Sequence, residues 1–239
     1  MKTKPLYKRI LLKLSGEGLG SEKGALDTQI MSNLANEIKS VYDMGVQICL
    51  VVGGGNFWRG AKGVSKGVER VTGDYIGMLA TIMNALAFAD ELEKNGMPAR
   101  VMTAFAVEGV GEVFNQSAAL RHLKKGRVVI FAGGTGSPFF TTDTCAVLRA
   151  TEMDCDACLK STQVDGIYDK DPLKNPKAKR YDTIDYQTAL DKKLGVMDLT
   201  AMAMAQDALL PIVVFNQSHK GALSEVVCGK GTYSILKKK

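Results

Sequence analysis

Segments with the pattern of a strand alternate with segments with the pattern of a helix along almost the whole chain. Residues 46–52 are apolar apart from Gln47, as expected for a strand whose two faces are both covered. Before them, residues 28–44 carry apolar side chains at helical spacing after Asp27, which is a suitable N-cap. A chain that repeats strand and helix in this order is expected to be an α/β protein, a three-layer αβα sandwich with a mainly parallel central sheet.

The same patterns predict the other elements and a single domain. Strands are expected at residues 9–14, 46–52, 100–103, 127–132, 156–160 and 212–216, with a last short segment at 232–236. Helices are expected at residues 28–44, 74–95, 111–125, 143–152, 184–194, 199–210 and 223–227. The loop at 165–182, rich in Asp, Lys and Pro, is the candidate boundary between a front lobe (about 1–160) and a back lobe (about 161–239) of one domain covering 1–239.

The composition is that of a packed globular protein. Of the 239 residues, 46% are hydrophobic, which is enough for one large α/β domain. The formal net charge is +6, part of it in the terminal lysines, and the other charges are mixed in sign along the chain. This distribution predicts no nucleic-acid-binding stripe, whereas a small polyanionic substrate suits the mild positive charge.

No segment has the pattern of a membrane anchor or an export signal. No continuous apolar run approaches the ~20 residues that a membrane-spanning helix needs. The basic N-terminus is followed only by Ile10, Leu11 and Leu12 before Lys13 interrupts the run, which is too short for a secretory signal. We therefore expect a cytoplasmic protein.

The five cysteines indicate packing rather than a disulfide framework, because their number is odd and their surroundings are apolar. Cys155 and Cys158 form one CxxC pair, but the chain has no second such pair, and His122 and His219 lie far away in sequence. A metal or redox site is therefore the weaker interpretation, and we expect both cysteines to be small core residues.

Small residues, hydroxyls and charges follow four of the predicted strands. The segments are Lys13-Leu14-Ser15-Gly16, Gly53-Gly54-Gly55-Asn56 with Arg59 beyond it, residues 133–143 (GGTGSPFFTTD) and residues 160–172 (KSTQVDGIYDKDP). Because parallel strands end at one edge of the sheet, the four segments are expected to converge on one crevice. Free backbone N–H groups and a helix N-terminus favour bound anions there. Each segment also has an ordinary interpretation as a solvated lysine, a glycine hinge or a capped turn.

Motifs of several other enzyme classes do not occur. The sequence has no GxxxxGK[ST] motif, no GxGxxG after its first strand and no GxSxG elbow around Ser15. P-loop NTPases, dinucleotide oxidoreductases and triad hydrolases are therefore disfavoured. Glycines and lysines without an evident nucleophile suit phosphoryl transfer, which depends on positioning and charge neutralisation.

Together these residues resemble the bacterial-type uridylate (UMP) kinases, a group within the amino acid kinase family. The resemblance runs from about Lys8 to about Tyr233 and rests on KRILLKLSGE (8–17), GGGNFWRG (53–60), GDYIGMLAT (73–81) and residues 133–143, with 160–168 and 196–198. The first two motifs recur across amino acid kinases, whereas TGSPFFTTD is more particular to UMP kinases. The resemblance implies an amino acid kinase-like fold and phosphoryl transfer from ATP to UMP in pyrimidine nucleotide biosynthesis.

The resemblance also implies roles for individual residues. It assigns ATP binding to Lys13, Leu14, Ser15, Gly16, Gly55, Arg59, Thr162, Tyr168 and Asp171, with Mg²⁺ arriving with ATP. It assigns UMP binding to Gly54, Asp74, Thr135, Gly136, Ser137, Pro138, Phe139, Phe140, Thr141 and Thr142. Lys13 and Arg59 would neutralise the transferred group, with Lys160 as a further catalytic candidate. Asp143 would orient the lysines rather than act as a base, because a phosphate nucleophile is already ionised.

The resemblance further implies a homohexamer built from dimers, with GTP as activator and UTP as inhibitor. Arg100 and Arg127 match positions associated with GTP, and the alternative is that they are surface charges at strand edges. Ser137 and Glu69 stand where relatives often or sometimes carry Asn. Ser137 keeps a hydrogen-bonding group with a shorter reach, whereas Glu69 adds negative charge, which bears on the effector response more than on catalysis.

Two other functions remain open. One is an amino acid kinase with a different substrate, which the run from Phe139 to Thr142 disfavours. The other is a non-catalytic nucleotide sensor or a nucleic-acid-binding regulator, which the sequence pI near 9.0 suggests. The joint presence of Lys13, Arg59 and Asp143 disfavours this second function.

Overall fold

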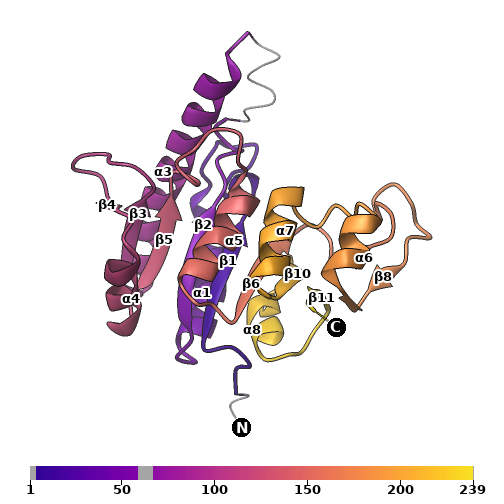
Figure 1. Ribbon diagram of the computed structural model, residues 1–239. Coiled ribbons are helices and arrows are strands. Elements are labelled where there is room, and N and C mark those ends of the chain that lie inside the picture. Colours follow the sequence, from indigo (N-terminus) through magenta and orange to yellow (C-terminus); the bar gives the residue numbers. More distant parts are fainter. Residues whose placement is uncertain (1–3, 59–66, 239) are drawn as a thin grey trace.

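A mainly parallel sheet forms the centre of the molecule. The computed structural model describes residues 4–58 and 67–238 (Figure 1). Within these residues, nine strands form one sheet in the order β4-β3-β5-β2-β1-β6-β10-β11-β9, and neighbours are parallel except β10 and β11. The strands are β1 (Arg9–Leu14), β2 (Gln47–Val52), β3 (Ala99–Thr103), β4 (Glu112–Val113), β5 (Val128–Ala132), β6 (Ala157–Thr162), β9 (Thr183–Ile184), β10 (Ile212–Asn216) and β11 (Tyr233–Leu236).

Helices cover both faces of this sheet, which confirms the predicted three-layer αβα sandwich. Because side chains alternate along a strand, Ile10 and Leu12 of β1 pack into one apolar cluster and Leu11 into the other. The first cluster contains residues of α1 (Thr28–Tyr42), α3 (Arg70–Lys94) and α8 (Ala222–Val227). The second contains residues of α4 (Gln116–Lys124), α5 (Thr142–Glu152), α6 (Tyr186–Asp191) and α7 (Leu199–Asp207).

The strands and most helices lie where the sequence predicts them, but several boundaries were wrong. Helix α4 begins at Gln116 instead of residue 111, because Asn115 caps it and residues 112–113 pair with β3 as β4. Helix α3 begins at Arg70 instead of residue 74. Helix α6 covers only part of the predicted 184–194, since Ile184 belongs to β9. The predicted loop at 165–182 contains a small hairpin, β7 (Ile167–Tyr168) and β8 (Arg180–Tyr181).

By length and composition, α3 is the one helix among the described residues that could cross a membrane. No continuous apolar run marks this helix in the sequence, because polar residues such as Asp74 and Asn84 interrupt it. In the structure, 44% of its most apolar 18-residue stretch is buried. Thr81 and Asn84 on its inner side bond to loops of the sheet. These contacts are those of a helix that covers the core of a folded domain.

The CxxC pair lies in the core. Cys158 is fully buried and Cys155 nearly so, and both belong to the apolar cluster on the α5 face. Burial raises the pKa of the Cys158 thiol, which disfavours the reactive thiolate. Both cysteines therefore act as small packing residues, as the sequence predicts.

We expect Asn115→Ala to lower the free energy of unfolding by about 1 kcal/mol, because the Ala118 N–H would lose the acceptor that Asn115 Oδ1 offers at 3.0 Å. Asn115→Asp keeps an acceptor at the cap and should stay close to the wild type. Urea unfolding followed by circular dichroism measures both variants. An equal loss in the two would contradict a capping role.

Candidate functional site

The four strands whose ends carry the predicted site residues are neighbours in the sheet. Their order is β5-β2-β1-β6, and each pairs with the next in parallel. Their carboxyl ends therefore open on one edge of the sheet, on the upper side of Figure 1. This arrangement confirms that the four segments converge.

Lys13 and Lys160 lie side by side at this edge because the strand register pairs them. Paired residues in adjacent strands point to the same face of a sheet, so two positive charges meet here. Asp143, at the start of α5, lies between them. Its Oδ1 is 2.9 Å from Lys13 Nζ, and its Oδ2 is 2.6 Å from Lys160 Nζ. We call Lys13, Asp143 and Lys160 the lysine–aspartate cluster.

The two lysines keep Asp143 ionised although its side chain is only 15% exposed. Burial alone raises the pKa of this carboxyl, but attraction by Lys13 and Lys160 outweighs burial and leaves the pKa below its ordinary value. The first turn of α5 also favours a negative charge. Lys160 is further fixed by a hydrogen bond from Nζ to Val196 O at 2.7 Å. The cluster keeps one net positive charge and therefore suits an anionic ligand.

The glycine segments after β1 and β2 pack tightly against each other and against α3. A Cβ atom at Gly16 would lie 2.4 Å from Gly53 O, and one at Gly54 would lie 2.8 Å from Gly77 O. No larger residue fits either position without displacing backbone. Trp58, the only tryptophan in the sequence, closes the second segment by donating its backbone N–H to Gly54 O at 2.9 Å.

The residues predicted to bind ATP form two groups. Leu14 at the end of β1, Ser15 and Gly16 directly after it, and Gly55 after β2 lie next to the cluster. Thr162, Tyr168 and Asp171 lie at and beyond the end of β6 and make local contacts. Thr162 Oγ1 donates to Val164 O, and Tyr168 Oη donates to Asp165 Oδ1, both at 2.6 Å. The hydrogen bond to Asp165 raises the pKa of Tyr168 above its ordinary value.

The residues predicted to bind UMP meet where α3, the glycine segments and the start of α5 come together. Asp74 on α3 accepts the backbone N–H of Phe139 at 2.8 Å. A Cβ atom at Gly53 would lie 3.6 Å from Thr142 Oγ1, so this segment reaches the glycines after β2. Phe139 and Phe140 are 66% and 50% exposed, and two aromatic rings thus face solvent. The same segment contains Thr135, Gly136, Ser137, Pro138 and Thr141.

The two arginines matched to the GTP effector, Arg100 and Arg127, are not brought to this edge. Arg59 lies outside the described residues. Arg100 is the second residue of β3 and Arg127 directly precedes β5, so both lie at the amino ends of their strands, opposite the cluster. Arg100 Nη1 lies 3.3 Å from Glu93 Oε1, and Arg127 Nη1 lies 2.9 Å from His122 Nδ1.

Sequence reasoning missed a buried polar contact that holds the glycine segments. Asn84 on α3 donates to Gly53 O at 2.6 Å, and it exchanges hydrogen bonds with Asn56 at 2.7 and 2.9 Å. Thr81, on the same helix, accepts the Gly133 N–H at 2.8 Å. Helix α3 thus holds the segments after both β2 and β5. Polar side chains among the apolar positions of this helix were the available signal.

Asp198 is a second residue without an assigned role from the sequence. It caps α7 by accepting the Ala201 N–H at 3.0 Å. It also accepts hydrogen bonds from the hydroxyl of Thr141, the N-cap of α5, and from the hydroxyl of Thr144 within α5. It therefore ties the α5 N-terminus, where Asp143 lies, to α7. Only the fold shows this link, because Asp198 and Thr144 are 54 residues apart in sequence.

This fold and this edge define a class of protein, an αβα protein with two lysines and a carboxylate where its parallel strands end. The chain belongs to the amino acid kinase family, whose model matches residues 8–216. It is 52% identical to the uridylate kinase of Psychromonas ingrahamii over 99% of this chain and 96% of that relative. It is 51% identical to the uridylate kinase of Ectopseudomonas mendocina over 97% of this chain and 94% of that relative. A solved UMP kinase structure from Bacillus anthracis matches with a TM-score of 0.94 and 37% identity, over 98% of this chain and 97% of its own.

We expect the stabilising contribution of ionised Asp143 to depend on pH. A carboxyl whose pKa is lowered by folding stabilises the fold above its unfolded pKa, about 3.9, and loses this contribution as the pH falls through the folded pKa. The free energy of unfolding of the wild type relative to Asp143→Asn should therefore decrease as the pH falls below about 5 and on through the lowered folded pKa. Urea unfolding at a series of pH values measures this difference.

Lys13→Met offers a control for the same measurement. It removes one of the two cations that lower the pKa of Asp143, so the folded pKa should rise toward the unfolded value and the pH-dependent part of the stability difference should become smaller. A difference between wild type and Asp143→Asn that does not change with pH would contradict the expected ionisation.

Proposed function

We propose that this protein is a UMP kinase, which transfers the γ-phosphoryl group of ATP reversibly to UMP to give UDP and ADP. This reaction belongs to the biosynthesis of UTP and CTP, and we expect it to take place in the cytoplasm. The observation that carries the proposal is the lysine–aspartate cluster at the edge where four strand ends converge. The nearly full-length similarity to uridylate kinases supports UMP as the acceptor.

In this proposal the cluster supplies charge rather than a nucleophile or a base. Lys13 and Lys160 neutralise charge on the transferred phosphoryl group, and Asp143 keeps their ammonium groups in place. The phosphate of UMP is largely ionised near neutral pH, since its second pKa is about 6, so no base is needed. A carboxylate already paired with two lysines suits this orienting role. Arg59 would add a further positive charge.

The two substrates would lie on the two sides of the cluster. ATP would lie over Leu14, Ser15 and Gly16, with Gly55 at its phosphates. Its nucleoside would be held by residues beyond β6, namely Thr162, Tyr168 and Asp171. UMP would be held by Gly54, by Asp74 and by residues 135–142. One domain would then have a front UMP-binding lobe (about residues 1–160) and a back ATP-binding lobe (about 161–239).

Mg²⁺ would accompany ATP. The described part of the chain has no group of three or more His, Cys, Asp or Glu side chains that could hold a metal ion. Both oxygens of Asp143 are paired with lysines. This arrangement of carboxylates suits a Mg²⁺ ion that is held mainly by the nucleotide phosphates. The ion would partly neutralise the charge of those phosphates.

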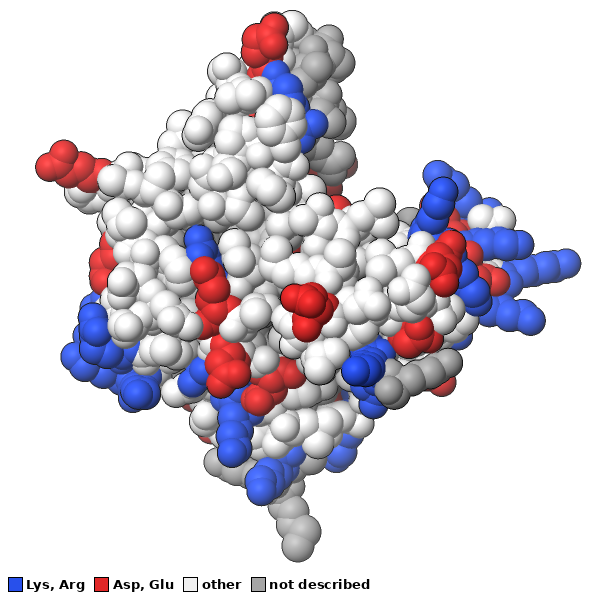
Figure 2. All heavy atoms as spheres, in the orientation of Figure 1, with Lys and Arg blue, Asp and Glu red and all other residues white. Residues whose placement is uncertain are grey.

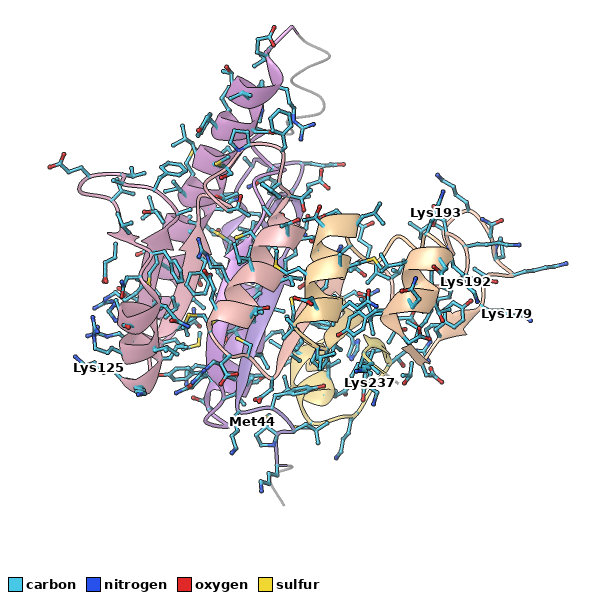
Figure 3. The ribbon with its side chains drawn as sticks, viewed as in Figure 1. Met44, Lys125, Lys179, Lys192, Lys193 and Lys237 are labelled. Carbon is cyan, nitrogen blue, oxygen red and sulfur yellow. The ribbon has the colours of Figure 1, made fainter. Side chains whose placement is uncertain are left out.

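A nucleic-acid-binding function is less well supported. Lys125 projects on one flank of the molecule, and Lys179, Lys192 and Lys193 project on the opposite flank (Figure 3). On the face in Figure 2, charges of both signs are interspersed, and a large area is uncharged. A nucleic acid backbone is bound by a continuous basic surface, which this face does not offer.

Control by GTP as activator and UTP as inhibitor is part of the proposal and rests on the resemblance. Arg100 lines a surface cavity of about 470 Å³. Three carboxylates, those of Asp90, Glu93 and Glu112, line the same cavity and disfavour a triphosphate within one subunit. An effector near Arg100 and Arg127 would therefore need cations from a second copy of the chain, and it would act on the cluster from the opposite edge of the sheet.

A homo-oligomer, with the homohexamer as the expected form, is also proposed. Helix α3 exposes an apolar stripe whose members recur every three or four residues and are each 40–49% exposed, namely Val71, Tyr75, Leu79, Met83 and Leu86. Residues at this spacing share one helix face. Such a stripe is complementary to itself, so a second copy related by a two-fold axis can cover it.

We expect Leu79→Glu to weaken this contact between copies, because it would bury a carboxylate in an apolar stripe. Size-exclusion chromatography with light scattering should show a smaller assembly than the wild type. Leu173→Glu changes an equally apolar residue that is 75% exposed outside the stripe, and it should leave the assembly unchanged. An unchanged mass for Leu79→Glu would contradict a contact through α3.

The proposed activity is tested by coupled ADP release with UMP, CMP and small acids as acceptors. Lys13→Ala should lower kcat by at least about 100-fold with little change in the KM for UMP, because Lys13 is proposed to act on the transition state. Asp74→Ala should mainly raise the KM for UMP. Activity on an amino acid or a carbamate but not on UMP would overturn the proposed function.

A further inference from the structure

At the start of α3, Arg70 and Asp74 contact each other and Phe139, which belongs to the segment proposed to bind UMP. Arg70 Nε lies 2.8 Å from Asp74 Oδ2, one helical turn away. The backbone N–H of Phe139 donates to the same oxygen, also at 2.8 Å. The guanidinium of Arg70 lies over the Phe139 ring, with Cζ 5.5 Å from the ring centroid. Arg70 therefore contacts both partners of the hydrogen bond between Asp74 and Phe139.

Phe139 needs such a contact because its backbone is strained. Its φ angle is +73°, in the left-handed region that side chains other than glycine seldom adopt. The side chain is 66% exposed, so burial in the core does not hold it there. Strained residues of this kind persist where neighbouring groups fix them, and they concentrate at ligand sites. Here the neighbouring groups are Asp74 and Arg70.

We propose that Arg70 is a positioning residue for the acceptor nucleotide. It acts through Asp74 and Phe139, which it holds in the arrangement that the acceptor meets. Among the described residues, both donors to Asp74 use Oδ2, so Oδ1 remains as an acceptor for a ligand. Asp74 is only 12% exposed, whereas Arg70 is 46% exposed at the rim. The proposal rests on the proposed function, since it concerns the same acceptor.

The alternative is that Arg70 and Asp74 form an ordinary ion pair on a helix surface, which contributes little. The same helix has a pair of that kind for comparison. Lys94 Nζ lies 2.6 Å from Asp90 Oδ2, again one turn apart, with side chains that are 63% and 67% exposed. Lys94→Met is therefore a matched control for Arg70→Met, because it breaks the same type of pair away from the site.

Steady-state kinetics test the proposal. We expect Arg70→Met to raise the KM for UMP about tenfold with kcat within about threefold of wild type, because binding rather than chemistry is affected. Arg70→Lys keeps the charge beside Asp74 and should recover part of the loss. Lys94→Met should match the wild type. An unchanged KM in Arg70→Met, or a loss of kcat alone, would overturn the proposal.

Hydrogen exchange of the ligand-free protein gives a readout that does not depend on activity. Peptides covering residues 135–141 should exchange faster in Arg70→Met than in wild type and Lys94→Met, because the Phe139 N–H loses a fixed acceptor. Equal exchange in all three proteins would overturn the positioning role. A wild type that does not phosphorylate UMP would overturn the proposed function, and the exchange measurement would still decide whether Arg70 positions the segment.

Discussion

The pairing of Lys13 with Lys160 in adjacent strands is the constraint around which the functional edge is built. The register of β1 and β6 brings two ammonium groups to the same face, where they would repel each other without a carboxylate between them. Asp143 supplies that carboxylate, and it can do so only if the N-terminus of α5 lies directly over the ends of these strands. Residues 133–141 must then span from β5 to that point. The charge balance of three residues thus accounts for the position of a helix and for the course of the segment before it.

Helix α3 links the two halves of this edge. Its inner side carries the polar residues that hold the segments after β2 and β5, through Asn84 and Thr81. Its first turn holds Phe139 through Asp74. Its outer side carries the apolar stripe that begins at Val71. One helix therefore contacts the glycine segments after β2 and β5 and also presents the surface on which a second copy could dock. The polar residues that interrupt its apolar sequence are the ones that make these contacts.

The sequence predicted the sheet better than it predicted the contacts between segments. Short, mainly apolar runs followed by small residues marked β1 and β2 closely, because a strand covered on both faces needs apolar residues along most of its length. The start of α4 was wrong, because the pairing of β4 with β3 competes with helix formation there. The position of Asp143 between two lysines depends on strand register, and the roles of Asn84 and Asp198 depend on partners distant in sequence. Local patterns carry no information on such pairs.

The single tryptophan has a practical consequence. Trp58 lies between the glycines after β2 and Arg59, and its backbone closes the turn on Gly54. In the described part of the chain its indole N–H is buried and has no hydrogen-bond partner. Indole emission shifts when the polarity or hydrogen bonding around the ring changes, so any rearrangement of the glycine segment alters the intrinsic fluorescence of the whole protein. The molecule thus carries an optical probe beside the proposed nucleotide site, and no label needs to be introduced to test for binding there in real time.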